Sequence, residues 1–272
     1  QPWQRLEREE VLRWLGENAK QFDIGILSQA ASSNTLLMQH AGLGADAAPG
    51  GSVLAVELQT AGRGRMGRVW HSGLGSTLTF SLLWRFDCGL NALSGLSLAV
   101  GVAIARALNG LGAQEVRLKW PNDILIGQGG PGSQRKLGGV LIEAQGDMLG
   151  PSAVVIGIGL NCFLPENLAG QIDQPAGALD EVCHMHDRNR LLAAVLRELA
   201  DALWQFAQEG FAVFSGEWEK YHIHQDQPVQ LRMADGTVMT GVARGVSESG
   251  ELLLETAQGV RQFNSGEVGV GR

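Results

Sequence analysis

Three arginines alternate with three glycines at residues 62–68, in the order Gly-Arg-Gly-Arg-Met-Gly-Arg, and Val69 and Trp70 follow. Guanidinium groups are permanently charged forks that bind carboxylates and phosphates. Glycine lets the backbone approach a ligand and offer N–H groups to an anion. Because glycine also weakens helices and strands, we expect this stretch, the arginine loop (residues 62–68), to be a mobile loop after a strand at 53–58. The alternatives are a solvated basic loop and a nucleic-acid-binding tail, although such tails are usually repeated and this stretch occurs once.

Three later stretches combine polar residues with strand-like or glycine-containing sequence; they are Lys119-Trp-Pro-Asn-Asp123, Lys136-Leu-Gly-Gly-Val-Leu-Ile-Glu143 and Gly157-Ile-Gly-Leu-Asn161. Asp123 is a candidate Mg²⁺ ligand, because hard cations prefer carboxylate and phosphate oxygens, and an Asx turn is its alternative. Taken alone, a lysine such as Lys136 at the start of a strand is usually solvated. Asn122 and Asn161 suit either nucleotide recognition or the satisfaction of buried backbone groups.

Together these stretches resemble, in order and spacing, the four motifs of the biotin–protein ligases, from about Ile26 to the C-terminus. The resemblance implies an α+β fold: a mixed central β-sheet with flanking helices, as in class II aminoacyl-tRNA synthetases and biotin synthetases, and a small C-terminal SH3-like β-barrel. It also implies the activity. ATP and biotin, with Mg²⁺, form biotinyl-5'-AMP, and the biotinyl group is then transferred to a lysine of a biotin carboxyl carrier protein, such as an acetyl-CoA carboxylase subunit.

The resemblance also assigns roles to single residues. It implies catalytic roles for Lys136 and Arg65, and a metal-binding role for Asp123. The implied biotin-binding residues are Ser32, Ser33, Asn34, Gln59, Arg63, Gly64, Arg65, Lys136 and Gly139. The implied nucleotide-binding residues are Arg65, Arg68, Trp70, Lys119, Asn122 and Asn161.

The sequence departs from the family at one of these places. The family usually has Asp-Ser-Thr-Asn where this chain has Ala31-Ser32-Ser33-Asn34, so a carboxylate is missing and serine replaces threonine. The hydroxyls that would contact the biotin head remain, and plain helix N-caps are the alternative reading of the two serines.

Hydrophobic periodicity predicts the elements that position these residues. We expect helices at 4–19, 34–39, 93–108, 188–208 and 211–221. We expect strands at 24–27, 53–58, 76–84, 116–119, 123–126, 136–144 and 153–160, with a turn at 127–133. Four short strands after Tyr221, at 229–233, 237–246, 251–255 and 260–263, predict the small barrel. The expected domains are therefore 1–224, which is catalytic, and 225–272.

Composition narrows the class of protein. With 44% hydrophobic and 18% charged residues, the 272-residue chain has a globular composition, without a signal peptide or membrane span. Three scattered cysteines favour a reducing compartment, so a cytoplasmic protein is expected. A net charge of −7, and only about 30 residues before Ser32, argue against DNA binding and predict a short form without a winged helix. A monomer and a homodimer both remain open.

Two other functions fit parts of the pattern. A lipoate–protein ligase has the same fold class and reaction type, but the arginine loop disfavours it. A non-catalytic biotin-binding regulatory module should lack Lys136 or the arginines, and both are present. The histidine pairs 184/186 and 222/224 do not complete a zinc pattern, so we expect no zinc site there.

Overall fold

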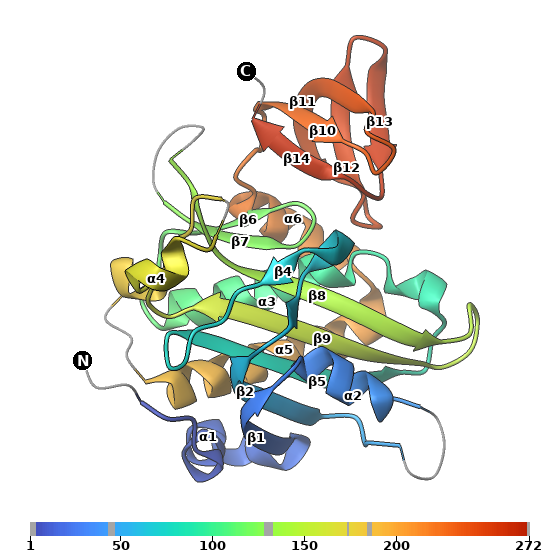
Figure 1. The fold of residues 1–272 in the computed structure, drawn as a ribbon. Helices are drawn as coiled ribbons and strands as arrows, with labels where there is room; N and C mark the ends of the chain where they lie inside the picture. The colour runs from blue at the N-terminus through green and yellow to red at the C-terminus, as the bar shows by residue number, and fades with distance from the viewer. Residues whose placement is uncertain (1–3, 43–46, 128–132, 173, 184–186, 271–272) are drawn as a thin grey trace.

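The computed structural model describes residues 4–42, 47–127, 133–172, 174–183 and 187–270. These residues form a large domain on a seven-stranded sheet and a small domain on a five-stranded sheet (Figure 1). The predicted α+β class is confirmed. Most of the turn predicted at 127–133, and both histidines of the 184/186 pair, lie outside the described residues. No helix within the described ranges is long and apolar enough to cross a membrane.

The large sheet is mixed, with the strand order β1-β2-β5-β9-β8-β7-β6. Its strands are β1 (Asp23–Ala30), β2 (Ser52–Gln59), β5 (Thr77–Phe86), β6 (Val116–Lys119), β7 (Asp123–Ile126), β8 (Arg135–Gly146) and β9 (Ser152–Asn161). β1 and β2 are parallel, and every other neighbouring pair is antiparallel. Every strand predicted for this sheet is present, with ends that shift by a few residues.

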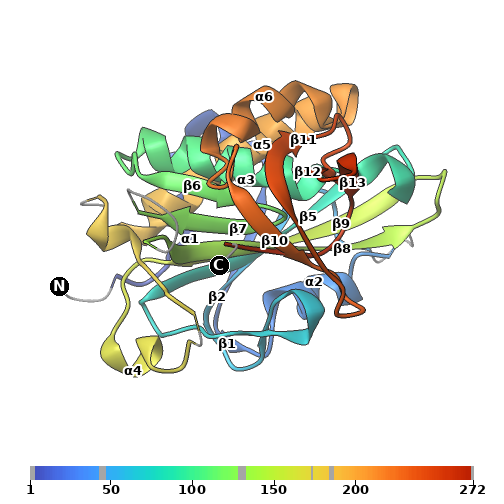
Figure 2. The same cartoon turned by 90° about the horizontal axis from the view of Figure 1, so that it is seen from above.

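Helices cover the two faces of the sheet unequally. α3 (Leu96–Gly110), α5 (Arg188–Glu209) and α6 (Ala212–Tyr221) lie together on one face, and α2 (Ser33–Gln39) lies on the other (Figure 2). Because side chains alternate along a strand, each central strand feeds two cores. Leu82 and Ile156 belong to the large core under the helices, whereas Leu83 and Val155 pack in a small core with Leu37 of α2.

Two helix boundaries differ from the prediction because of glycine. The helix expected at 4–19 is α1 (Arg8–Leu15) followed by a 3₁₀ helix, η1 (Gly16–Gln21). Gly16, at φ 59°, ends α1, because this left-handed backbone conformation cannot continue the helix. The helix expected from residue 93 begins at Leu96, after Gly95 at φ 79°. A 3₁₀ helix, η3 (Leu90–Leu93), precedes it, and the short α4 (Glu166–Ala169) and η4 (Leu179–Glu181) were not predicted.

The small sheet has five antiparallel strands in the order β13-β12-β11-β10-β14. They are β10 (Pro228–Arg232), β11 (Val238–Val246), β12 (Leu252–Thr256), β13 (Gly259–Phe263) and β14 (Glu267–Val270). The sequence predicted four of them; β14 was missed because its glycine-rich surroundings resemble a turn. It pairs with β10, so the end of the described chain returns to the start of the small domain.

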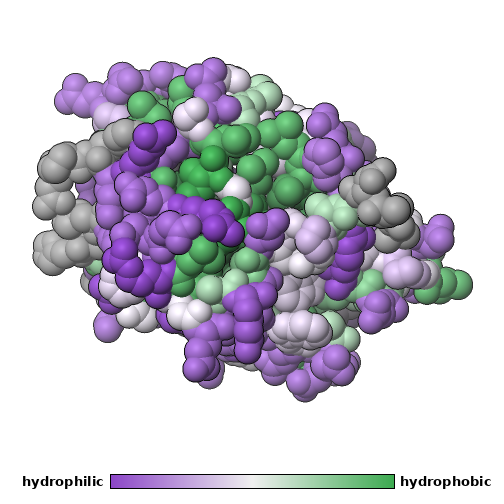
Figure 3. All heavy atoms as spheres, turned by 90° about the horizontal axis from the view of Figure 1, so that it is seen from below, coloured by the Kyte–Doolittle hydropathy of each residue, from purple (hydrophilic) through white to green (hydrophobic). Residues whose placement is uncertain are grey.

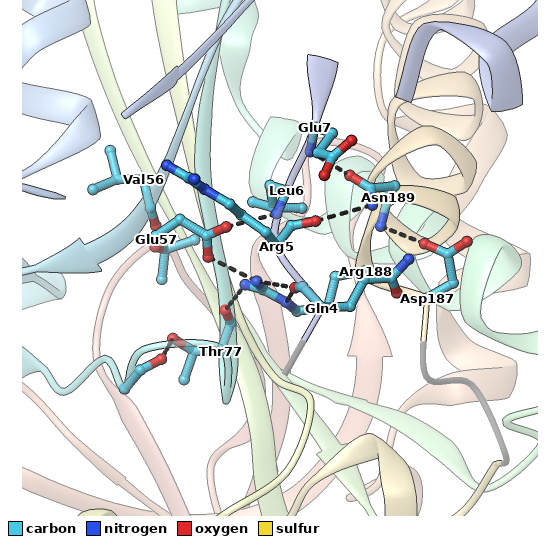
Figure 4. Close-up of polar contacts among 12 residues, drawn as sticks. Gln4, Arg5, Leu6, Glu7, Val56, Glu57, Thr77, Asp187, Arg188 and Asn189 are labelled. Atoms are coloured by element: carbon cyan, nitrogen blue, oxygen red, sulfur yellow. Dashed lines mark hydrogen bonds and ion pairs between the residues drawn. The ribbon is translucent and has the colours of Figure 1, made fainter. Parts of the chain in front are cut away.

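The N-terminal segment is fixed to the large sheet by a buried ion pair (Figure 4). Arg188, at the start of α5, contacts Glu57 of β2 at 2.7 Å, and both side chains are less than 5% exposed. Arg188 also donates to the backbone oxygens of Gln4 and Thr77, and Glu57 accepts from the Leu6 amide. Four segments that are distant in sequence therefore meet at one pair of charges.

The sheet ends at β1 on the side opposite to the small domain, and this edge belongs to the face shown in Figure 3. Apolar residues gather there within a border of polar ones. Leu27 of β1 is 39% exposed. On β1 the backbone oxygen of Ile24 accepts a hydrogen bond from Arg8 Nε of α1 at 3.1 Å.

His222 and His224 join α6 to β10 and are both buried. Burial lowers the pKa of His222 to about 3, with a further contribution from His224, and it lowers the pKa of His224 to about 4, with a contribution from Lys119. Both rings are therefore neutral in the folded protein at neutral pH. His222 stacks against Trp218 of α6, and the amide of the intervening Ile223 donates to Leu118 of β6.

This burial predicts acid lability. Because the folded pKa of His222 lies below the unfolded value near 6.5, its neutral form contributes stability that is complete above pH 6.5 and is lost as the pH falls towards 3. The loss at pH 5 is about 2 kcal/mol for this histidine. Urea denaturation at pH 7.5 and at pH 5 gives the fall in the free energy of unfolding between the two pH values. That fall should be about 2 kcal/mol smaller in His222→Phe than in the wild type. The exposed His40→Phe is the control, and an identical pH dependence in all three proteins would contradict the assignment.

Candidate functional site

A cavity of about 100 Å³ lies on the face of the large sheet that carries α2. The arginine loop and the strand ends that follow it form its roof. Its lining residues are Ser32, Ser33, Asn34, Gln59, Arg63, Gly64, Arg65, Arg68, Val69, Trp70, Phe80, Asn122, Asp123, Lys136, Gly139, Val140, Leu141, Gly157, Ile158, Gly159 and Gln174.

One end of the cavity is built by the N-terminus of α2. Ser32 is the N-cap, and its side-chain oxygen accepts from the Thr35 amide at 3.4 Å. The Ser33 amide donates to Oε1 of Gln59 at 2.7 Å, across from the end of β2. This bond occupies the oxygen of the Gln59 amide and leaves its NH₂ group able to donate.

A chain of side-chain hydrogen bonds continues below this end. Ser81 Oγ of β5 lies 2.7 Å from Ser33 Oγ and donates to Asn34 Oδ1 at 2.5 Å. Asn34 Nδ2 donates to the Leu141 oxygen at 3.2 Å and to Glu143 Oε2 at 3.0 Å. A buried network whose members satisfy one another fixes each side chain in one orientation. This end of the cavity is therefore polar and rigid, and its one carboxylate, Glu143, is balanced by an ion pair with Arg63.

Two glycines of β9 make room for neighbouring side chains. A Cβ on Gly157 would lie 2.2 Å from Asn34 Oδ1, and a Cβ on Gly159 would lie 2.4 Å from the indole ring of Trp70. The structure shows that these glycines admit Asn34 and Trp70, which in turn line the cavity.

The arginine loop is a small hairpin, and the prediction of a stretch without regular structure was wrong in this respect. β3 (Gly62–Arg63) pairs with β4 (Val69–Trp70), and the 3₁₀ helix η2 (Arg65–Gly67) connects them. Met66 and Gly67 have φ 56° and 74°. A Cβ on Gly62 would lie 2.4 Å from the Trp70 oxygen, so the close pairing of the two short strands requires glycine.

Cations gather at the other end of the cavity. Lys136 Nζ contacts Asp123 Oδ1 at 2.6 Å, and Arg65 Nη1 donates to Asn122 Oδ1 at 3.2 Å. Burial lowers the pKa of Arg65, although the carboxylate of Asp123 opposes this shift. Arg68 lines the same end. The local excess of positive charge suits an anion, and Asp123 is the one carboxylate among the lining residues.

All of the predicted site residues line this cavity except Lys119 and Asn161. Lys119 lies opposite Asp123 in the backbone register of β6 and β7, and burial lowers the pKa of Lys119. Asn161 is buried, and its Nδ2 donates to the backbone oxygens of Lys136 and Gly177 at 3.3 and 3.0 Å. In this structure Asn161 therefore fixes the strand that carries Lys136, which agrees with the alternative considered for a buried asparagine.

Sequence reasoning missed two polar partners of the site, Ser81 and Glu143. In the sequence, Ser81 looks like any polar residue of a strand with alternating polarity. Glu143 looks like a solvated residue near the end of a strand. Their roles depend on contacts more than 40 residues away along the chain. Glu143 stands last in the third motif, and that position was the only available signal.

The residues that the structure describes include no group of three potential metal ligands from His, Cys, Asp and Glu. One carboxylate nevertheless suffices for Mg²⁺ where phosphates and water supply the remaining ligands. The cavity as a whole is suited to a ligand with a neutral hydrogen-bonding head at the α2 end and an anionic group at the Lys136 end.

Comparison with known proteins gives a consistent picture. Residues 28–161 match the biotin/lipoate A/B protein ligase family, and residues 224–271 match the biotin protein ligase C-terminal domain. The bifunctional ligase/repressor BirA of Escherichia coli is 35% identical over 98% of this chain and 79% of its own length. The biotin–[acetyl-CoA-carboxylase] ligase of Mycobacterium tuberculosis is 33% identical over 93% and 90%. The biotin protein ligase of Aquifex aeolicus, solved with biotin and ATP, is 29% identical and superposes with a TM-score of 0.72 over 92% of this chain and 99% of its own.

Replacing Gly157 by alanine should disturb the network beside α2. The new methyl group would displace Asn34 from its bonds with Ser81 and Glu143. Leaving such groups unpaired costs about 2 kcal/mol, which corresponds to a fall in Tm of about 4–8 °C. Thermal unfolding measures this change in Tm. The control is Gly216→Ala on α6, because a Cβ at Gly216 meets nothing within 4 Å. An unchanged Tm in Gly157→Ala would show that Asn34 moves without cost.

Proposed function

This chain belongs to the biotin/lipoate A/B protein ligase family and is a ligase; we propose that it activates biotin with ATP to biotinyl-5'-AMP and transfers the biotinyl group to a lysine of a biotin carboxyl carrier protein. The observation that carries the proposal is the division of the cavity into a neutral, hydrogen-bonding end and a cationic end. Biotin has the same division, with a bicyclic urea head and a carboxylate tail.

The α2 end fits the urea head. The urea carbonyl needs donors and its N–H groups need acceptors, and the hydroxyls of Ser32 and Ser33 can serve as either. The NH₂ group of Gln59 adds a donor, since its oxygen already accepts from the Ser33 amide. The apolar lining residue Leu141, which is half-buried and lies opposite Gly157, offers contact to the rest of the ring system. The carboxylate missing at Ala31 is not needed for these bonds.

The cationic end fits the reacting groups. In the first step a carboxylate oxygen of biotin attacks the α-phosphorus of ATP, the bond to the bridging oxygen breaks, and pyrophosphate leaves with that electron pair. Two anions must approach each other, so fixed positive charge stabilises the transition state. Lys136 and Arg65 are placed for the carboxylate and the α-phosphate, and Arg68 for the departing phosphates. We assign Trp70, Lys119 and Asn122 to the nucleotide side, with Asn161 supporting Lys136.

Asp123 is the candidate ligand for Mg²⁺. It lines the cavity beside Lys136, and a Mg²⁺ ion held by one carboxylate, phosphates and water is common at nucleotide sites. When bound there, Mg²⁺ would neutralise phosphate charge. The ion pair with Lys136 holds the Asp123 side chain in place.

In the second step the acceptor lysine attacks the mixed anhydride, forms an amide and releases AMP. The hairpin of the arginine loop covers the cavity and shields the anhydride from water, which would otherwise hydrolyse it. Arg63 and Gly64 form the part of this cover that lies over the biotin side.

Three further assignments belong to the proposal. We place the domain boundary at residues 224/225, between α6, which ends at Tyr221, and β10, which begins at Pro228. We propose a cytoplasmic location, since Cys88, Cys162 and Cys183 form no disulfide with one another. A monomer or a homodimer without nucleic acid remains the expectation from the sequence.

Exchange of labelled pyrophosphate into ATP tests the first step directly. The protein should catalyse the exchange only when biotin and MgATP are both present, because reversal needs the adenylate. Labelled biotin should then pass to a biotin carboxyl carrier domain, and lipoate should compete poorly for the site. Absence of biotin-dependent exchange would reject the proposed function, and exchange that requires lipoate would identify the other acid.

Lys136→Ala should lower the exchange rate by about 10²–10³, the usual loss on removing a group that stabilises transition-state charge. Lys136→Arg, which keeps a cation, should lose less. Lys20→Ala is the control, because Lys20 is an exposed lysine of η1 far from the cavity in sequence and fold. Circular dichroism should show an unchanged fold in each variant. Activity of Lys136→Ala equal to that of the Lys20 variant would show that Lys136 has no part in adenylation.

A further inference from the structure

The arginine loop lacks the hydrophobic contacts that usually hold a loop in place. Met66, its one apolar side chain, is 63% exposed, and Val69, which directly follows the loop, is 65% exposed. Ordering each residue costs roughly 1–2 kcal/mol of backbone entropy, and glycines raise that cost. Polar contacts must therefore hold the hairpin over the cavity.

A glutamate pairs with the arginine at each end of the loop. Arg63, at the start, forms an ion pair with Glu143 of β8, and Arg68, at the end, forms one with Glu267 of β14. Glu143 belongs to the large sheet, whereas Glu267 belongs to the small domain. The two ends of one short loop are thus tied to different domains.

Each carboxylate is also connected to its own half of the cavity. Glu143 accepts from Asn34 with its second oxygen, so it joins Arg63 to the polar network at the α2 end. Glu267 lies near the cationic end, where its charge raises the pKa of Arg65 and of Lys119 and partly offsets the effect of burial. A guanidinium has five N–H donors, so an arginine paired with one carboxylate still has N–H groups for a ligand.

We propose that Glu143 and Glu267 are positioning residues that set the two halves of the arginine loop separately, Glu143 through Arg63 for biotin and Glu267 through Arg68 for the nucleotide. This inference rests on the proposed function. It gives the small domain a defined part in adenylation, because Glu267 lies at the start of its last described strand. Neither glutamate lines the cavity itself.

The test is steady-state pyrophosphate exchange with Glu143→Gln and Glu267→Gln, with biotin and ATP varied in turn. Glu143→Gln should raise the KM for biotin about three- to tenfold, because the carboxylate serves both Arg63 and Asn34. Glu267→Gln should raise the KM for ATP about two- to fivefold, which is the effect of an exposed ion pair. Each variant should leave the KM of the other substrate and kcat within about twofold of wild type.

Two glutamates in comparable ion pairs away from the cavity are the controls. Glu217→Gln breaks the pair with Arg106 between α6 and α3, and Glu255→Gln breaks a pair with Arg244 inside the small domain. Both should keep wild-type constants. Trypsin provides a second readout, since Arg63, Arg65 and Arg68 are cleavage sites: the ligand-free Glu143→Gln and Glu267→Gln proteins should be cut in the loop faster than either control.

The outcomes separate the inference from the function on which it rests. A wild-type protein without biotin-dependent exchange would reject the function. An active wild type with unchanged KM values in both variants would reject the inference alone. A lower KM for ATP in Glu267→Gln would also overturn it, because that result would mean that Glu267 competes with phosphate for Arg68 instead of orienting it.

Discussion

The buried ion pair between Glu57 and Arg188 is the interaction on which the position of the site depends. Glu57 lies two residues before Gln59, where β2 ends and the approach to the arginine loop begins. Arg188 is the first residue of α5, the longest helix of the described chain. Removing one member of such a pair leaves an uncompensated buried charge, at a cost of about 3–5 kcal/mol. The pair therefore fixes the end of β2 relative to the helical layer, and the cavity is built from that end.

The consequences of that fixed end extend across the sheet. Gln59 accepts a hydrogen bond from the Ser33 amide, so the N-terminus of α2 is held beside the end of β2. Ser81 and Asn34 then extend the network to β5 and β8. Because these side chains face away from the large core, they can be polar without cost to the packing beneath them. Helices on one face supply stability, and the opposite face is left for binding.

The sequence was most informative where a residue type has a local reason. The strand β5 was predicted, and the N-cap at Ser32 was one of two readings of that serine, because each depends on its immediate neighbours. Lys136 was singled out only through the family motif. The sequence was least informative where two distant polar residues share a bond. Arg188, at a helix start, resembles a solvated charge, yet it is 4% exposed and bonded to residues more than 100 positions away. Pairing partners of this kind are decided by topology, which residue patterns describe only in part.

The cationic end of the cavity also has an electrostatic consequence for the whole fold. Arg65, Arg68, Lys119 and Lys136 repel one another, and burial already lowers the pKa of Arg65 and Lys119. Without compensating charge, the free protein would relieve this repulsion by moving the loop away. Asp123 compensates from within the large domain and Glu267 from the small one. When a nucleotide binds, its phosphates would supply the negative charge that Asp123 and Glu267 supply in the free protein. The repulsion among the four cations, which destabilises the free protein, would then turn into attraction for the ligand. A protein with a net charge of −7 can concentrate its cations in this way only because neighbouring carboxylates hold them together before the ligand arrives.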